Sequence, residues 1–203
     1  MLGLARHARL VDVGKRPGGS RTQEQINNLL VELGLAGFEV VRLKGGDPFL
    51  FGRGGEEAIA LAAAGIPFSV TPGVTSALAG PAAAGIPVTH RGVSPAVTVV
   101  TGHRQSGAPP VDWRSLARVG GTIVVLMGVA ERARIAHELQ TGGLPADTPV
   151  TAVKSATLVG EQIHRLRLAD LGQAPIENPA VIVIGEVAAL DVTAVAELAT
   201  AVA

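Results

Sequence analysis

Glycines and charged residues are concentrated in residues 40–57, VVRLKGGDPFLFGRGGEE. Because glycine has no side chain, Gly45 and Gly46 would let the backbone approach a flat or polar ligand closely. Asp47, directly after this pair, would place an acceptor for ribose hydroxyls or for a cationic ligand group at the tip of a loop. Glycine, aspartate and proline are also common in ordinary β-turns. The residues alone therefore favour a ligand loop and a plain turn about equally.

The usual nucleotide-binding motifs do not account for this stretch, because it contains neither G-x-G-x-x-G nor G-x-x-x-x-G-K-[ST]. A second group of cations and glycines, VGKRPGGS, contains Lys15 and Arg16. A lysine here can anchor a carboxylate, or it can exchange protons where burial or a nearby charge lowers its pKa. A solvated lysine beside a turn is the alternative interpretation.

Further cations fall in two loops expected at the junction of the two halves of the chain. His90 and Arg91 lie in THRG, and His103 lies in TGHR. Together they could form an anion-binding cleft, although a lone histidine is more often a local hydrogen-bonding group. The five histidines show no metal-ligand spacing such as H-E-x-x-H, and cysteine is absent. We therefore predict no metal site.

The composition limits the classes of function. The 203 residues are 47% hydrophobic but only 2% aromatic, with a formal net charge of zero. The chain can bury a sizeable core built from aliphatic side chains. Without aromatic stacking platforms or a basic excess, nucleic acid is not an expected partner. Neither a signal peptide nor a membrane span is recognisable in the sequence, which predicts a cytoplasmic protein and no membrane partner.

Strand-like and helix-like segments alternate along the chain, which predicts an α/β fold. Helices are expected around Ile26–Leu33, with a capping box formed by Ser20 and Gln23, and in a second segment that opens with Glu56 and Glu57. Two more are expected over residues 74–85 and from about 131 to 140. Strand-like segments are expected at residues 9–14, 38–43 and 68–73. The pattern restarts with segments 96–103, 120–128, 148–156, 161–171 and 179–187. The β-branched runs predict strands buried on both faces, and the restart predicts domains at 1–92 and 93–203.

Several blocks in a fixed order carry a resemblance to a known family. They are VGKRPGG, VVRLKGGDPFLFGRGGEE, AGIPFSVTPGVTSALAGPAAAGIPVTHRG, VTVVTGH, LMGV and PAVIVIGEV. In order and spacing the chain resembles the uroporphyrinogen-III C-methyltransferases of the tetrapyrrole methylase superfamily. The resemblance covers residue 9 to about residue 190.

This resemblance implies two α/β domains, with S-adenosyl-L-methionine bound in a cleft between them, in a homodimer. It implies a set of cofactor contacts at Gly45, Gly46, Asp47, Leu50, Thr75, Ser76, Met127 and Ala156. The family usually has glycine where this chain has Ala156, so an added methyl group would tighten the site. Lys15 matches a lysine with a proton-donor role. We expect Arg16, His90, Arg91 and His103 to meet the carboxylates of the tetrapyrrole, from their charge and their positions in loops.

The implied reaction is methylation of uroporphyrinogen III at C2 and then, through precorrin-1, at C7 to give precorrin-2, a step toward sirohaem or cobalamin. The family also has an earlier strand and a Gly-Pro-Gly-Asp type loop that have no counterpart here. The sequence therefore predicts an N-terminally truncated fold with uncovered apolar edges. Alternatives are a noncatalytic tetrapyrrole- or nucleoside-binding remnant, a subunit completed by another chain, and a methyltransferase of a later corrinoid intermediate.

Overall fold

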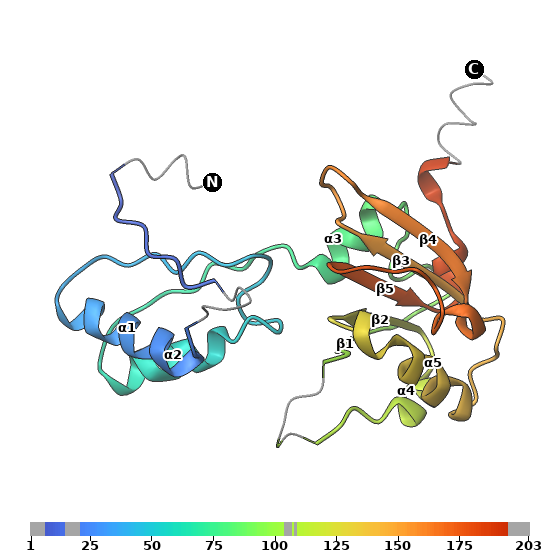
Figure 1. The fold of residues 1–203 in the computed structure, drawn as a ribbon, viewed down its shortest axis with the longest axis horizontal. Coiled ribbons are helices and arrows are strands. Elements are labelled where there is room, and N and C mark those ends of the chain that lie inside the picture. The colour runs from blue at the N-terminus through green and yellow to red at the C-terminus, as the bar shows by residue number, and fades with distance from the viewer. Residues whose placement is uncertain (1–6, 15–20, 104–106, 108, 195–203) are drawn as a thin grey trace. The chain divides into compact units, whose positions relative to one another are not determined.

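The computed structural model describes residues 7–14, 21–103, 107 and 109–194, and it divides the chain into two compact units (Figure 1). The first unit is Met1–Gly73 and the second is Val74–Ala203. The units therefore separate between Gly73 and Val74, whereas the predicted domain boundary at residues 92 and 93 stays a prediction.

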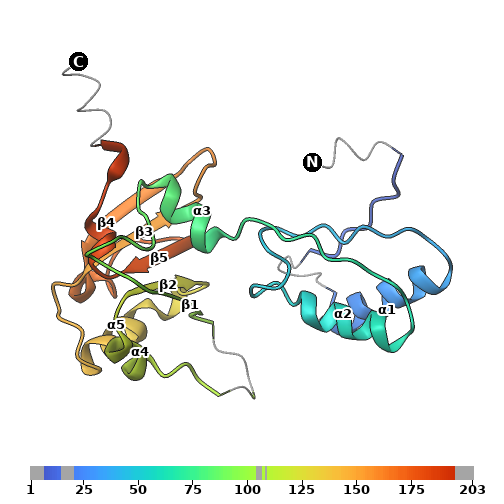
Figure 2. The same cartoon turned by 180° about the vertical axis from the view of Figure 1, so that it is seen from behind.

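The first unit contains two helices that pack against each other (Figure 2). Helix α1 is Gln23–Leu35 and helix α2 is Gly54–Ala63. Ile26 and Leu30 of α1 are buried, as their helical spacing predicts. The capping box predicted for Ser20 and Gln23 is wrong. Thr22 is the N-cap and exchanges hydrogen bonds with Gln25, so the box lies two residues later and Gln23 becomes a buried first residue of the helix.

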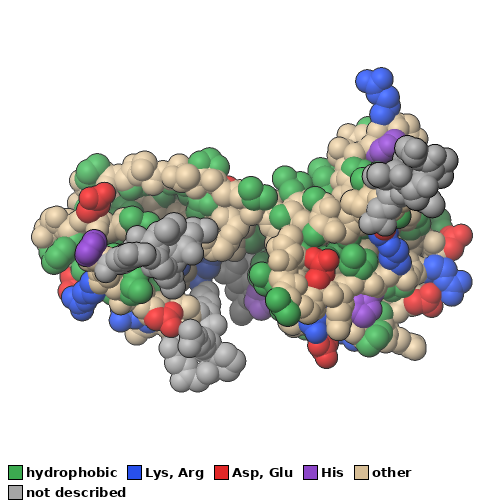
Figure 3. All heavy atoms as spheres, turned by 90° about the horizontal axis from the view of Figure 1, so that it is seen from above, with side chains coloured by type: hydrophobic (Ala, Val, Ile, Leu, Met, Phe, Trp, Pro, Cys, Tyr) green, Lys and Arg blue, Asp and Glu red, His purple; other side chains and the backbone are tan. Residues whose placement is uncertain are grey.

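The strands predicted at residues 9–14, 38–43 and 68–73 are not formed in the described part of the first unit. A strand requires a neighbouring backbone to pair with, and none of these segments takes part in a hydrogen-bonded ladder. Their apolar side chains stay at the surface: Val41 is 82% exposed and Phe38 is 63% exposed. Figure 3 shows hydrophobic side chains at the surface of this unit. These residues therefore present apolar surface to solvent in the first unit.

The second unit is built on a five-stranded mixed sheet with strand order β1-β2-β5-β3-β4. Strands β1 and β2 pair in parallel, and the β2–β5, β5–β3 and β3–β4 pairs are antiparallel. The strands are β1 Val97–Thr101, β2 Thr122–Leu126, β3 Pro149–Lys154, β4 Gln162–Arg167 and β5 Ala180–Ile184. The helices are α3 Ser76–Ala83, α4 Trp113–Val119 and α5 Arg132–Thr141, with short 3-10 helices η2 Val129–Glu131, η3 Leu168–Asp170 and η4 Glu186–Ala189.

Both faces of this sheet are covered, as its β-branched runs predict. Ile123 and Val125 on one face pack in a cluster with Trp113 of α4 and Leu139 of α5. Helix α3 packs against β5 and β2, and Figures 1 and 2 show it on the other side of the sheet from α4 and α5. The three inner strands are consequently buried almost throughout.

The pairing pattern gives β1, β2 and β3 the same direction, because β5 is antiparallel to both β2 and β3. The carboxyl ends of these three strands therefore lie at the same end of the sheet, where open α/β sheets bind their ligands. Within the described residues, no helix is long and apolar enough to cross a membrane.

Candidate functional site

The loop Lys44–Gly54 of the first unit is closed by hydrogen bonds to a single carboxylate. Oδ1 of Asp47 accepts hydrogen bonds from the backbone N–H groups of Phe49, at 2.8 Å, and Leu50, at 3.2 Å. Its Oδ2 accepts a third, at 3.1 Å, from the backbone N–H of Gly73. These bonds, that from Gly73 foremost, lower the pKa of Asp47, so the side chain is a carboxylate at neutral pH. Asp47 thus holds the loop together, a role that sequence reasoning did not assign to it.

Glycines are required where this loop contacts itself and where it contacts the segment at Gly73. A Cβ on Gly73 would lie 2.3 Å from the carbonyl oxygen of Gly46, and a Cβ on Gly54 would lie 2.5 Å from that of Pro48. Gly46 also has a φ of 73°, in the left-handed region. Contacts within the protein exclude side chains at Gly54 and Gly73, and the backbone conformation disfavours one at Gly46.

Gly45 differs from these glycines. A Cβ added to Gly45 would meet nothing within 4 Å, and its φ is not positive. The protein therefore provides no internal reason for a missing side chain at this position. An exposed backbone surface facing open space is what a closely approaching ligand requires, so the loop fits the cofactor that the resemblance implies.

Backbone strain is concentrated in the predicted cofactor segments. Among the described residues, non-glycine residues with positive φ occur only at Phe51, Arg53, Met127, Ser155 and Thr157. The first two belong to the loop of the first unit, and the others lie within three residues after the end of β2 or β3. Such conformations are unfavourable for side-chain-bearing residues and cluster at functional sites.

Charged residues at the start of α2 were missing from the predicted site. Arg53 is the N-cap of α2 and pairs with Glu56 through two hydrogen bonds of 2.8 and 2.7 Å. Glu57 is 5% exposed and accepts a hydrogen bond from Lys44 at 2.8 Å. The letters GRGGEE reveal the charges, but they do not show that one glutamate turns inward and the other outward.

Three predicted residues of the second unit follow strands that point the same way. His103 comes after β1, Met127 after β2, and Ala156 after β3. The loops after β1 and β2 touch, since a Cβ on Gly102 would lie 2.4 Å from Cα of Gly128. The structure therefore brings these three positions to one end of the sheet, as adjacent cofactor and substrate sites require.

The alanine that replaces the usual glycine is accommodated by the backbone. Ser155 and Thr157 have φ values of 50° and 65°, whereas Ala156 between them is not in the left-handed region. A side chain at this position consequently carries no backbone strain. The backbone N–H of Thr157 donates to Oε2 of Glu161 at 2.6 Å, which closes this turn.

Thr75 and Ser76 lie at the start of α3. The Thr75 side chain is the N-cap and accepts a hydrogen bond from the backbone N–H of Ala77 at 3.2 Å, while Ser76 is exposed. A Cβ on Gly80, one turn later, would lie 2.4 Å from Cγ1 of Val181. Glycine thus lets α3 pack closely on the amino end of β5.

The substrate residues predicted in the second unit lie at different ends of its strands. The turn that contains His90 and Arg91 is joined to the start of β2 by a 2.9 Å hydrogen bond between the hydroxyls of Ser94 and Thr122. His103 instead follows the far end of β1, a strand of five residues that is about 13 Å long at ~3.3 Å per residue. A ligand that contacts both would have to extend along the strand. Lys15 and Arg16 lie outside the described residues.

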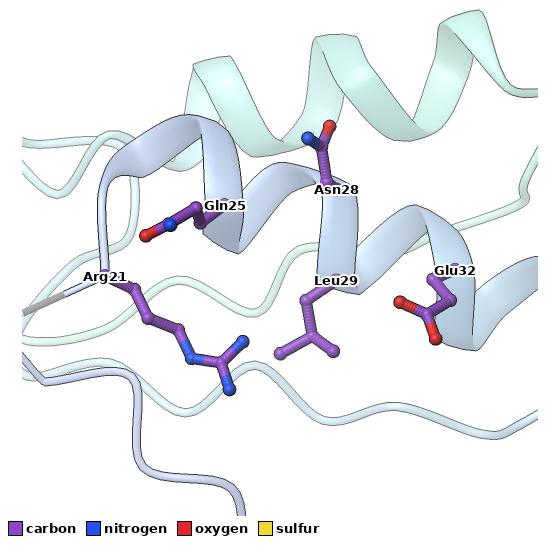
Figure 4. Close-up of a pocket in the computed structure, with 5 residues that line it drawn as sticks. All are labelled: Arg21, Gln25, Asn28, Leu29 and Glu32. Carbon is purple, nitrogen blue, oxygen red and sulfur yellow. The ribbon is translucent and has the colours of Figure 1, made fainter.

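A shallow pocket of about 300 Å³ lies along α1 and contains none of the predicted site residues (Figure 4). Its lining residues are Arg21, Gln25, Asn28, Leu29 and Glu32. Groups of three or more side chains able to hold a metal ion are absent from the described part of the chain.

The mixed α/β fold, the glycine-lined loop and the strained turns at the strand ends agree with the tetrapyrrole methylase fold that the resemblance implies. Residues 3–172 match the family Tetrapyrrole (Corrin/Porphyrin) Methylases. The chain belongs to this family.

Relatives in sequence and in structure agree with this assignment. A siroheme synthase of Neisseria meningitidis serogroup C is 49% identical over 192 residues, which are 92% of this chain and 40% of that protein. The chain thus spans about two fifths of the length of the curated relatives that it matches. A uroporphyrin-III C-methyltransferase from Thermus thermophilus, solved in complex with S-adenosyl homocysteine, has a TM-score of 0.73 and 42% identity, over 84% of this chain and 78% of that one. A cobalt precorrin-4 methyltransferase has a TM-score of 0.76 but 26% identity, over 86% and 78% of the two chains.

Proposed function

We propose that the chain transfers methyl groups from S-adenosyl-L-methionine to C2 and C7 of uroporphyrinogen III, giving precorrin-2. The observation that carries the proposal is the loop at Gly45. The backbone of Gly45 faces open space, and Phe51 and Arg53, further along the loop, have strained positive φ angles. The identities with the siroheme synthases and with the Thermus methyltransferase support this choice of substrate. The lower identity with the precorrin-4 enzyme makes a later corrinoid substrate a weaker candidate.

Methyl transfer of this kind depends on positioning rather than on covalent help from the protein. When bound, the cofactor supplies a methyl group on a positively charged sulfur. In our proposal, Gly45 and Gly46 present their backbone to it, and Asp47 and Leu50 keep the loop in shape. We propose Met127 and the turn at Ala156 as further cofactor contacts.

The remaining predicted roles belong to the same proposal. Lys15 would donate a proton during the reaction, and Arg16, His90, Arg91 and His103 would bind the carboxylates of the substrate. We also propose that the protein acts as a homodimer in the cytoplasm, on the path to sirohaem or cobalamin.

A glycine-to-alanine substitution tests the cofactor site. We expect Gly45→Ala to weaken binding of S-adenosyl homocysteine about tenfold or more, because the new methyl group occupies ligand space, and to leave folding unchanged. Gly55→Ala is the matched control, since its Cβ also meets nothing within 4 Å but lies inside α2. Equal affinity in both variants, measured by isothermal titration calorimetry, would refute the assignment of the loop.

Activity is tested by incubating the purified chain with S-adenosyl-L-methionine and uroporphyrinogen III and measuring the masses of the products by mass spectrometry. Two added methyl groups are expected. The unpaired segments and exposed apolar side chains of the first unit favour a second candidate, a noncatalytic binding protein for a tetrapyrrole or nucleoside. That candidate predicts cofactor binding without methylated product, while a Thermus methyltransferase assayed alongside is active.

A further inference from the structure

A buried carboxylate in the first unit connects three segments of the chain. Glu57 lies in the first turn of α2 and is 5% exposed. Its Oε2 accepts a hydrogen bond from Nζ of Lys44 at 2.8 Å, and its Oε1 accepts bonds of 3.2 Å from Nε of Arg42 and from Nε2 of Gln23 in α1. One side chain therefore ties α1, α2 and the segment 42–44 together.

The charge of Glu57 is retained despite its burial. Burial alone raises the pKa of this carboxyl, but the hydrogen bonds from Lys44 and Gln23 and the charges of Arg42 and Lys44 outweigh burial and lower the pKa. The side chain of Lys44 is itself only 10% exposed. Loss of the Glu57 charge would leave a nearly buried ammonium group without this partner, which is costly.

Lys44 is the residue directly before Gly45, so the ion pair fixes the point at which the chain enters the ligand loop. The exit of the loop is fixed separately, by the backbone N–H of Gly54, which donates to the carbonyl of Pro48 at 3.0 Å. Gly54 is the first residue of α2, three positions before Glu57. The entry of the loop is thus connected through one ion pair to the helix that begins at its exit.

We propose that Glu57 is a positioning residue for cofactor binding, which acts through Lys44 by holding the loop Gly45–Gly54 in its ligand-accepting shape. The part that concerns the cofactor rests on the proposed function, whereas the part that concerns the loop does not. Glu57 itself bonds to Lys44, Arg42 and Gln23, and none of its atoms lies within 4 Å of a Cβ added at Gly45.

Hydrogen–deuterium exchange tests the part that concerns the loop without any ligand. In Glu57→Gln we expect the amides of Phe49, Leu50 and Gly54 to exchange at least about tenfold faster, because their hydrogen bonds open more often. Peptides from the second unit should keep their protection. Glu138→Gln is the matched control, since it removes a glutamate paired with Arg114 in the second unit. Unchanged exchange in the loop would overturn the proposal.

Cofactor titration and kinetics test the remaining part. For Glu57→Gln we expect the Kd for S-adenosyl homocysteine and the KM for S-adenosyl-L-methionine to rise about tenfold, with kcat changed less than about twofold. A fall in kcat with KM unchanged would show a structural defect and would overturn the positioning role. If the wild-type chain binds no S-adenosyl homocysteine, the proposed function fails, and the cofactor half of the inference fails with it.

A second variant, Lys44→Gln, keeps the proposal testable if Glu57→Gln folds poorly. It removes the link to the loop but leaves Glu57 bonded to Arg42 and Gln23, so the buried carboxylate keeps partners. The same faster loop exchange is expected. In the double variant, the loss of binding free energy should be clearly smaller than the sum of the losses in the two single variants, because both substitutions break the same contact. Additive losses would overturn the claim that Glu57 acts through Lys44.

Discussion

The carboxylate of Asp47 and the backbone N–H of Gly73, 26 positions apart in the sequence, are joined by a hydrogen bond of 3.1 Å. The same carboxylate accepts bonds from two amides of its own loop. The loop with the paired glycines is thus attached to the segment that leads out of the first unit toward Thr75. Asp47 therefore fixes the loop that carries the proposed cofactor contacts and holds it against the segment at Gly73.

Replacing Asp47 with asparagine tests this role. We expect Asp47→Asn to weaken binding of S-adenosyl homocysteine about tenfold, since an amide nitrogen cannot accept from an N–H group and one of the three bonds is lost. The affinity is measured by calorimetry. Asp170→Asn, which alters an aspartate paired with Arg167 in the second unit, should bind normally. Normal binding by Asp47→Asn as well would show that the loop does not depend on this carboxylate.

Gly73→Ala tests the contact between the two loops. Its Cβ would lie 2.3 Å from the carbonyl oxygen of Gly46, so one of the loops must move and the bond to Asp47 must lengthen. Limited proteolysis should cut the variant faster within residues 44–54. Gly55→Ala should be cut no faster than the wild type. Alanine stabilises a helix interior relative to glycine by up to about 1 kcal/mol, so this variant can also be cut more slowly. Identical cleavage patterns would contradict the contact.

The unfolding free energy should fall as the pH drops below about 4.5, the ordinary pKa of a glutamate. Several carboxyls have a lowered pKa in the folded chain, namely Asp47, Glu57, Asp112, Glu138, Glu177 and Asp191. The unfolded chain therefore binds more protons in acid, so the contribution present at pH 7 is lost on acidification. Urea titrations at pH 7, 5, 4 and 3 measure this loss. A midpoint that stays constant down to pH 3 would contradict it.

The core of the second unit should respond strongly to loss of volume. Leu139 of α5 is fully buried against the sheet, so we expect Leu139→Ala to lower the unfolding free energy by about 2–5 kcal/mol. Val159→Ala truncates a fully exposed side chain in the β3–β4 loop and should change stability by less than about 0.5 kcal/mol. Thermal unfolding followed by circular dichroism compares the two. Similar midpoints would mean that α5 is not part of the cooperative core.

Local patterns in the sequence predicted the elements whose stability is local or whose burial is continuous. The spacing of Ile26 and Leu30 predicted α1, and the β-branched runs predicted the inner strands β2, β3 and β5. The segments 38–43 and 68–73 have the same apolar character but form no ladder. Pairing depends on which backbone lies alongside, and residue types within one segment do not specify that neighbour.

The chemistry of the site was predictable by residue type but not by partner. The sequence singled out Asp47 as an acceptor, but it could not show that the donor is Gly73. Positive φ at Met127 and Ser155 has no sequence signal, because neither residue is a usual choice for that conformation. The two adjacent glutamates of GRGGEE differ only in the face of α2 that each occupies, so the buried role of Glu57 emerged from packing.

The loops after β1 and β2 lie close together: a Cβ on Gly102 would be 2.4 Å from Cα of Gly128, and the N–H of Gly102 donates to the carbonyl of Leu126 at 2.8 Å. Under the proposed roles, one loop carries a cofactor contact, Met127, and the other carries a substrate contact, His103. Because the two loops approach so closely at Gly102, we expect a ligand that shifts one loop to shift the other. We therefore expect the two ligands to bind with thermodynamic coupling, in which the first ligand changes the affinity for the second and its own affinity changes reciprocally by the same factor.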